Sequence, residues 1–351
     1  MSLYRTYRPQ KFSEVCGHEH IVKTLQASIL YKSVHHAYLF CGTRGSGKTT
    51  LARIYSKTLN CESVQKQLAD EKIKTVNEIE PCLQCTSCTN QGIDIQEIDA
   101  ASHRGIDEIR EIQESARVSS FGSKYKVFII DETHMLSTAA CNALLKVLEE
   151  PPAHVIFILA TTEPHKLLPT ILSRVQRFDF RPLSVETITS KLKSIIANEK
   201  LQADEQALTL IAKGGRGSMR DAESVLERMI ALSKGNITHE LVSTELGIMT
   251  DDTLDQLLRP ITDGDSIAAM AWIRQAAENG VRFDHLCAQL IEYIRDRFLI
   301  QQPPEQGLTT QQALALIRLF MRAQHEIPHS IIPQLPLEMA ALEAASVIKK
   351  A

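Results

Sequence analysis

No stretch of this 351-residue sequence approaches the roughly 18 consecutive apolar residues that a membrane-spanning helix requires, so we expect no membrane partner. The first nine residues lack the apolar core of a signal peptide, and eight cysteines in a chain of this size do not resemble a disulfide scaffold. We therefore expect a cytoplasmic protein. The net charge of −3 argues against a generally basic nucleic-acid binder, so any DNA contact must come from a local patch or a shared surface.

Internal repeats and a low-complexity tail are also absent, and the composition is ordinary for a soluble globular protein, with 44% hydrophobic and 23% charged residues. The length is sufficient for two or three domains, each with its own core.

Residues 42–49 read GTRGSGKT and match the phosphate-loop pattern G-x-x-x-x-G-K-[ST] at every fixed position. An apolar run precedes the loop and a helical pattern follows it, so backbone N–H groups and the positive end of a helix dipole can converge on phosphate oxygens. The alternative, a glycine turn that merely ends a strand, is disfavoured because such a turn does not need the adjacent Lys-Thr pair. We predict phosphate contact by Lys48, a Mg²⁺ contact by Thr49, and nucleotide contacts by Gly42, Thr43, Arg44, Gly45, Ser46, Gly47, Lys48, Thr49 and Thr50.

Residues 126–130 form an apolar run of strand length, typical of a strand that is buried on both faces. The run delivers Asp131 and Glu132 at its carboxyl end, where an acidic pair is costly unless a positive group meets it. In a phosphate-loop protein Mg²⁺ meets the first carboxylate, and the second is free to polarise the attacking water. We assign these roles to Asp131 and Glu132.

Two other segments leave alternatives open. The apolar run at residues 155–160 ends in Thr161 and Thr162, where a hydroxyl could orient the lytic water or contact the γ-phosphate, or could simply finish a strand. The segment Tyr7, Arg8 and Pro9 lies upstream of the phosphate-loop strand. It could fold over the base of a bound nucleotide or pack on the core as an N-terminal arm.

Four cysteines, Cys61, Cys82, Cys85 and Cys88, supply the number and type of ligands that a closed tetrahedral Zn²⁺ site needs. A structural zinc module over about residues 61–92 is favoured over a redox cluster or unligated thiols. The polar stretch from Glu62 to Glu80 shows no clear period. The remaining cysteines, Cys16, Cys41, Cys141 and Cys287, are expected to be small core residues.

Strand-like and helical segments alternate up to about residue 182, including a strand expected at residues 93–98 and a helix from Gly105 to Ile112. This alternation predicts an α/β domain with a parallel sheet. No strand-like run appears beyond Leu183. Helical segments at 187–199 and 204–213 lead to a turn and a further helix near residue 219, and a section from about residue 250 is helical, with a loop at Pro303-Pro304.

These motifs occur in the order found in AAA+ ATPases, and the chain resembles, over essentially its whole length, the tau/gamma subunits of the bacterial DNA polymerase III clamp loader. The resemblance is carried by the phosphate loop, the four cysteines, and residues 7–9 (YRP), 35–40 (HHAYLF), 97–102 (EIDAAS), 131–136 (DETHML), 142–152 (NALLKVLEEPP), 159–162 (LATT), 173–174 (SR) and 217–222 (GSMRDA).

The resemblance implies an AAA+ ATPase domain with an inserted zinc module at 1–182, a helical lid at 183–246 and a helical collar at 247–351. It implies an ATP-hydrolysing motor subunit, using ATP, Mg²⁺ and Zn²⁺, that opens the sliding clamp and loads it on primed DNA. The expected partners are the other subunits of a hetero-pentamer, the clamp, primed DNA and, indirectly, single-strand-binding protein. The chain would belong to the DNA polymerase III holoenzyme without carrying a polymerase site.

By the same resemblance Thr162 takes the role of sensor 1, Arg220 that of sensor 2, and Arg174 that of an arginine finger acting on a neighbouring subunit. The alternative for Arg174 is an ion pair with Glu149 or Glu150 that holds the domain together. The chain departs from the family in Val175, which follows Arg174 where the family has Cys, and in a longer stretch between Cys61 and Cys82. It also ends after the collar, as expected for a short form or a fragment.

Two other functions compete with this one. A non-hydrolysing scaffold subunit of the same assembly would be expected to lose the Lys-Thr pair or the acidic pair, and both are intact. A ring helicase of the branch-migration type would need a DNA-binding C-terminal module with strands, whereas the last hundred residues read as helical. The cysteine cluster also argues against the helicase.

Overall fold

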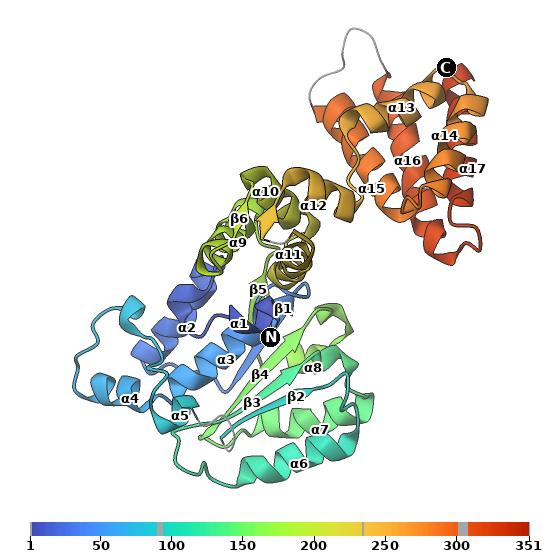
Figure 1. Cartoon of the computed structure of the whole chain (residues 1–351). Helices are drawn as coiled ribbons and strands as arrows, with labels where there is room; N and C mark the ends of the chain where they lie inside the picture. The colour runs from blue at the N-terminus through green and yellow to red at the C-terminus, as the bar shows by residue number, and fades with distance from the viewer. Residues whose placement is uncertain (1, 90–93, 234, 301–307, 351) are drawn as a thin grey trace. The chain divides into compact units, whose positions relative to one another are not determined.

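The computed structural model describes residues 2–89, 94–233, 235–300 and 308–350 (Figure 1). The chain divides into two compact units, Met1–Ile237 and Thr238–Ala351. The predicted loop at Pro303-Pro304, the first residue of the strand expected at 93–98 and the last residues of the expected zinc module, 90–92, lie outside the described residues. Within the described ranges, no helix is both long and apolar enough to cross a membrane.

A five-stranded parallel sheet forms the centre of the first unit, with the spatial order β2-β3-β4-β1-β5 (Figure 1). The strands are β1 (Ala37–Gly42), β2 (Ile95–Asp99), β3 (Lys126–Asp131), β4 (Val155–Thr161) and β5 (Gln176–Phe180). The apolar runs predict β1, β3 and β4 correctly. The sequence analysis does not identify β5, because Gln176, Arg177 and Asp179 are exposed and break the apolar pattern.

Helices cover both faces of this sheet, since successive side chains of a strand point to opposite sides. On one face, Tyr38, Phe40, Ile129 and Ile158 pack with α2 (Glu19–Leu30) and α3 (Lys48–Leu59). On the other, side chains of the alternate residues pack with α6 (Ile106–Arg117), α7 (Thr138–Glu149) and α8 (Pro169–Leu172). This explains why the central strands β1, β3 and β4 are apolar on both faces along most of their length.

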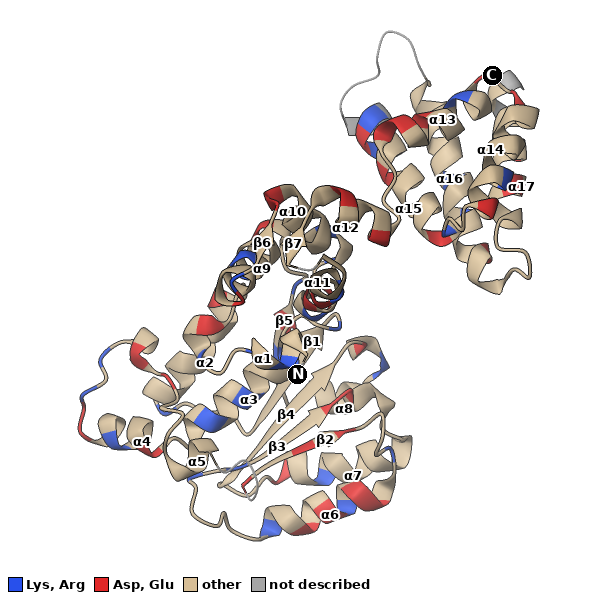
Figure 2. Ribbon diagram, viewed as in Figure 1, with Lys and Arg blue, Asp and Glu red and all other residues tan. Residues whose placement is uncertain are grey.

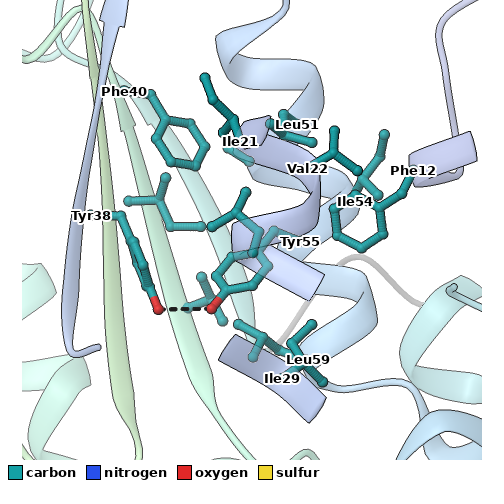
Figure 3. Close-up of a cluster of buried hydrophobic side chains, with 14 of the residues drawn as sticks. Phe12, Ile21, Val22, Ile29, Tyr38, Phe40, Leu51, Ile54, Tyr55 and Leu59 are labelled. Atoms are coloured by element: carbon teal, nitrogen blue, oxygen red, sulfur yellow. Dashed lines mark hydrogen bonds between the residues drawn. The ribbon is translucent and has the colours of Figure 1, made fainter. Parts of the chain in front are cut away.

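Figure 3 shows the first of these two cores, between β1 and the helices α2 and α3. The hydroxyl groups of Tyr38 and Tyr55 are 2.8 Å apart and share a hydrogen bond within it. The Tyr55 hydroxyl also lies 2.8 Å from Ser28 Oγ. Because a buried hydroxyl group is costly without a hydrogen-bond partner, these three hydroxyl groups satisfy one another within the core. Their hydrogen bonds also hold α3, and with it the phosphate loop, against β1.

The first unit also contains short helices and 3₁₀ turns. They are α1 (Leu3–Thr6), α4 (Glu62–Ala69), α5 (Thr86–Thr89) and the 3₁₀ turns Phe12–Glu14, Val76–Glu78, Thr133–Met135 and Pro164–Lys166. Helix α4 forms within the polar stretch that shows no period in the sequence, and only Val64 of this helix is buried. Helix α6 buries Ile109 and Ile112 and carries charged residues of both signs (Figure 2).

The sheet is followed by three helices, α9 (Val185–Asn198), α10 (Glu205–Gly214) and α11 (Met219–Ser233). The prediction that no strand occurs beyond Leu183 is wrong in one detail. Two strands of two residues each, β6 (Gln202–Ala203) and β7 (Asn236–Ile237), form a short parallel pair. A strand of two residues is too short to leave a periodic signal in the sequence.

The second unit is helical throughout its described residues. Its helices are α12 (His239–Leu246), α13 (Asp251–Thr262), α14 (Ser266–Glu278), α15 (Phe283–Ile294), a π-helical turn (Arg295–Ile300), α16 (Thr310–Glu326), a 3₁₀ turn (Ile327–His329) and α17 (Leu335–Lys350). Leu257, Ile273, Leu290 and Phe320 lie in one buried cluster that joins four of these helices. The unit therefore has a core of its own.

Candidate functional site

The loop between β1 and α3 has the curled backbone that its glycines predict. Gly45 has φ of 75° and Gly47 has φ of 101°, a left-handed region that side chains disfavour. A Cβ atom at Gly45 would also lie 1.9 Å from Ser218 Oγ. Helix α3 begins at Lys48, directly after the turn, so its unpaired N-terminal N–H groups face the same point.

Lys48 is nearly buried at the mouth of this loop, with 5% of its surface exposed. Its Nζ donates to the carbonyl oxygens of Gly42, at 2.8 Å, and Thr43, at 2.9 Å. Burial lowers the pKa of Lys48, while the carboxylates of Glu132 and Asp131 act in the opposite direction. The ammonium group is thus held against the loop, close to acidic partners.

The ends of β3 and α3 place two oxygen ligands together. The Thr49 hydroxyl donates to Asp131 Oδ2 at 2.7 Å. The other carboxylate oxygen of Asp131 accepts from the backbone N–H of Glu132 at 2.9 Å. A hydroxyl and a carboxylate oxygen side by side fit the preference of Mg²⁺ for hard oxygen ligands.

Glu132 is held by two side chains from neighbouring elements. It has φ of 48°, and its Oε2 accepts a hydrogen bond from the Thr162 hydroxyl at 3.1 Å. The Nδ1 atom of His134 lies 3.4 Å from the same oxygen and 2.9 Å from Thr161 Oγ1. Sequence reasoning gives His134 no role, because its contact with Glu132 depends on the turn after β3.

A cavity of about 450 Å³ opens over the loop and the acidic pair. Among the predicted residues it is lined by Lys48, Thr49, Asp131, Glu132, Arg220, Arg8, Pro9, Arg44, Gly45, Ser46, Gly47 and Thr50. Asp99, Ala101 and Met219, which lie in the family motifs at 97–102 and 217–222 without an assigned role, also line it. Sequence reasoning missed its other lining residues, which belong to no motif: Tyr4, Val15, Cys16, Leu183, Lys191 and Glu223. Cys16, expected to be a core residue, is half-buried and lines this cavity instead.

The start of α11 contacts the phosphate loop directly. The backbone N–H of Met219 donates to the carbonyl oxygen of Gly45 at 3.2 Å. The next residue, Arg220, places its guanidinium carbon 4.7 Å from the ring centre of Tyr4, within the range of a cation–π contact. The residue expected as sensor 2 therefore lies at the cavity, but its charge faces an aromatic ring.

The lining of this cavity does not include the predicted residues Tyr7, Gly42, Thr43, Thr162 and Arg174. The Tyr7 hydroxyl donates to Glu199 Oε1 at 2.6 Å, so Arg8 and Pro9 line the cavity without it. Arg174 forms an ion pair with Glu149 at 2.8 Å and donates to the carbonyl of Thr170 at 2.8 Å, in a separate surface hollow. The structure of the single chain thus contains the ion pair that the sequence offers as an alternative to the arginine finger.

The four cysteines predicted as zinc ligands meet in one cluster. Their sulfur atoms all lie within 4.8 Å of one another, and a tetrahedral zinc–thiolate site places them about 3.8 Å apart. The backbone N–H of Cys85 donates to Cys82 Sγ at 3.3 Å, and that of Cys82 to Cys61 Sγ at 3.4 Å. Burial raises the pKa of the Cys82 thiol, but hydrogen bonds from the backbone N–H groups of Gln84 and Cys85 contribute to lowering this pKa to about 7. The cluster therefore fits a zinc ion.

Two family descriptions match the sequence. "DNA polymerase III, delta subunit" matches residues 17–184, and "DNA polymerase III clamp loader subunit, ATPase lid domain" matches residues 187–235. Among solved structures, a variant of RuvB from Thermotoga maritima superimposes with a TM-score of 0.50 at 20% identity, covering 89% of this chain and 98% of that chain. At this identity the likeness concerns the fold alone.

Curated relatives share more of the sequence. The chain is 42% identical to the DNA polymerase III subunit tau of Bacillus subtilis, covering 86% of this chain and 52% of the relative. It is 37% identical to the tau subunit of Escherichia coli, covering 94% and 49%, and 35% identical to the gamma subunit of Buchnera aphidicola, covering 86% and 80%. The chain thus spans about half the length of the two tau subunits.

Proposed function

Because this chain belongs to the family of DNA polymerase III tau and gamma subunits, we propose that it is the ATP-hydrolysing motor subunit of a clamp loader. The observation that carries the proposal is the cavity in which Lys48, Asp131 and Glu132 meet. This combination of a phosphate loop and an acidic pair is the one that ATP binding and hydrolysis require. The cytoplasmic location expected from the sequence stays a prediction.

Binding of ATP is assigned to the phosphate loop. The N–H groups of Gly45 to Thr50 cradle the phosphates, and Lys48 exchanges its loop carbonyl partners for phosphate oxygens. Thr49 and Asp131 hold Mg²⁺, which supplies charge neutralisation for the phosphates. Arg8 and Pro9 cover the nucleotide from the N-terminal side of the cavity.

Hydrolysis is assigned to Glu132, which takes up the proton of the attacking water. Its Oε2 accepts from Thr162, and the remaining lone pairs of the carboxylate can accept a hydrogen bond from the attacking water. Arg220 would leave the ring of Tyr4 to contact the phosphates as sensor 2. Arg174 would leave Glu149 and complete the site of the adjacent subunit.

The domain roles follow the family. We propose an ATPase domain at 1–182, a lid at 183–246 and a collar at 247–351 that joins subunits into a hetero-pentamer. The four cysteines bind one structural Zn²⁺, since four protein ligands leave no open coordination position for chemistry. ATP binding and hydrolysis then drive opening of the sliding clamp and its release on primed DNA. Single-strand-binding protein is an indirect partner at the primed DNA.

Reconstitution tests this function. The chain is mixed with cognate loader subunits, the mass of the complex is measured, and ATP-dependent retention of the clamp on primed circular DNA is followed. Wild-type chain should assemble and load the clamp, and Lys48→Ala should assemble but fail to load. Lys72→Ala, which removes an exposed lysine paired with Asp70, is the matched control and should load normally. An assembled wild-type complex that retains no clamp with ATP would refute the motor assignment.

A further inference from the structure

The proposed nucleotide cavity is lined by more than the phosphate loop and the acidic pair. Its lining also includes Val15, Cys16, Leu183, Lys191 and Glu223. Burial raises the pKa of Cys16, and the charges of Lys191 and Glu223 act on the same thiol, so these three side chains are neighbours. They come from the segment before α2, from α9 and from α11.

Glu223 lies on the cavity side of α11, one helical turn after the residue that contacts the phosphate loop. The backbone N–H of Met219 bonds to Gly45, and Glu223 follows four positions later, about 6 Å further along the helix axis. When triphosphate oxygens occupy the loop, this spacing places Glu223 beside the nucleoside half of the ligand.

Glu223 is largely buried, with 5% of the residue exposed, and its carboxylate oxygens reach the cavity that the residue lines. Among the described residues no hydrogen bond or ion pair involves its side chain. Burial raises its pKa to about 7, although the positive charges of Lys191 and Arg8 lower it. An unpaired buried carboxyl group costs folding free energy, and such a cost at a cavity wall marks a group kept for a ligand.

We propose that Glu223 accepts a hydrogen bond from the nucleoside half of bound ATP, either from the adenine amine or from a ribose hydroxyl, and thereby sets nucleotide affinity and selectivity. The inference rests on the proposed ATP-binding function. A carboxylate is an acceptor only, and the amine and the two ribose hydroxyls are the N–H and O–H donors of adenosine. Hydrogen bonds to an ionised acceptor are stronger than neutral ones.

Equilibrium binding of diphosphates, which are not hydrolysed, separates these donors. The probes are the Mg²⁺ complexes of ADP, purine riboside diphosphate, 2′-deoxy-ADP and 3′-deoxy-ADP. Wild-type chain should bind at least one analogue about tenfold or more weakly than ADP, and the weakened analogue identifies the donor. The affinity of Glu223→Leu for ADP should fall to the affinity that wild type shows for the weakened analogue. The affinity of Glu223→Leu for that analogue should change little.

The conservative variant and pH give a second readout. Gln keeps an acceptor oxygen that does not titrate, so Glu223→Gln should retain part of the selectivity at every pH. In wild type the ionised carboxylate is present above the pKa, so the ADP-to-analogue affinity ratio should rise from pH 6 to pH 8. Because ADP and its analogues carry the same diphosphate group, the effect of phosphate ionisation on binding cancels in this affinity ratio. The charged and titratable groups that line the cavity with Glu223 are Tyr4, Arg8, Cys16, Arg44, Lys48, Asp99, Asp131, Glu132, Lys191 and Arg220.

Stability distinguishes a ligand role from a structural one. Removing an unpaired buried carboxyl should leave nucleotide-free Glu223→Leu at least as stable to heat as wild type, whereas a structural Glu223 predicts a lower melting temperature. Glu227→Gln is the control, because Glu227 lies one turn further along α11 and accepts from the backbone N–H of Leu3 instead of lining the cavity. It should leave the selectivity unchanged.

The outcomes separate this inference from the function on which it rests. If wild type binds none of the four diphosphates, the nucleotide site itself is wrong. If wild type binds ADP and Glu223→Leu binds it equally well, or loses affinity for all four ligands alike, the role of Glu223 is refuted while the ATP site stands.

Discussion

In the nucleotide cavity, Lys48, Asp131 and Glu132 meet within one chain, and the Thr49 hydroxyl already contacts the carboxylate of Asp131. At the surface around Arg174, the guanidinium instead pairs with Glu149, outside that cavity. A site that one chain assembles can bind its ligand alone. Under the proposed function Arg174 serves the site of a neighbouring subunit, so the two regions should respond differently to mutation.

The largest expected effect concerns Arg174. An arginine finger supplied by a neighbour is worth about 10³ to 10⁵ in hydrolysis rate in known systems. We expect Arg174→Ala to bind ATP and fold normally, and to lower ATP hydrolysis of the assembled complex by a factor in this range.

A mixing experiment checks that the finger acts between chains. An Arg174→Ala chain keeps an intact phosphate loop, which the finger of a Lys48→Ala neighbour can serve. The mixture should therefore recover part of the hydrolysis that each variant lacks alone. If assembly is intact and the mixture is as inactive as its components, Arg174 has no role in trans.

The next effect concerns the acidic pair within the cavity. Glu132→Gln should lower hydrolysis about 10²- to 10⁴-fold, because general-base assistance is lost, and should leave ATP binding intact. Lys48→Ala should lose hydrolysis because phosphate binding itself weakens. Parallel binding and single-turnover measurements distinguish the two, and hydrolysis by Glu132→Gln at the wild-type rate would show that the assignment of Glu132 is wrong.

The sequence predicts the motif residues of the cavity better than its walls. Strand β1 is apolar from Ala37 to Cys41 and β3 from Val127 to Ile130, so the positions of Lys48 and Asp131 at one edge of the sheet follow from the pattern alone. Tyr4 and Glu223 belong to no motif, and their approach depends on how α1 and α11 pack. The contact between Thr162 and Glu132 likewise requires the register of β3 and β4, which no sequence pattern supplies.

The cysteine cluster is a second site that one chain assembles by itself. We expect one zinc per chain, and we expect Cys85→Ser to lose the metal and to lower the free energy of unfolding by several kcal/mol, because binding free energy at such a site is largely folding free energy. ATP affinity should change little. Cys287→Ser, which alters a buried thiol of the second unit, should keep its zinc. Metal analysis of fresh, reduced wild-type protein that finds no zinc would contradict this assignment.

The smallest expected effect comes from the carboxylate that pairs with Arg174. The two side chains of this ion pair are 34% and 50% exposed, and exposed pairs contribute at most about 1 kcal/mol to stability. Glu149→Gln should therefore change the free energy of unfolding by less than this and leave hydrolysis by the assembled complex within a few-fold of wild type, since Arg174 is released rather than lost. Glu150→Gln, at the adjacent exposed position, is the matched control.

A double-mutant cycle of Glu149→Gln with Arg174→Ala measures the coupling energy of this ion pair directly. A coupling well above 1 kcal/mol, together with normal hydrolysis in Arg174→Ala assemblies, would show that this arginine holds the domain together and serves no neighbouring site.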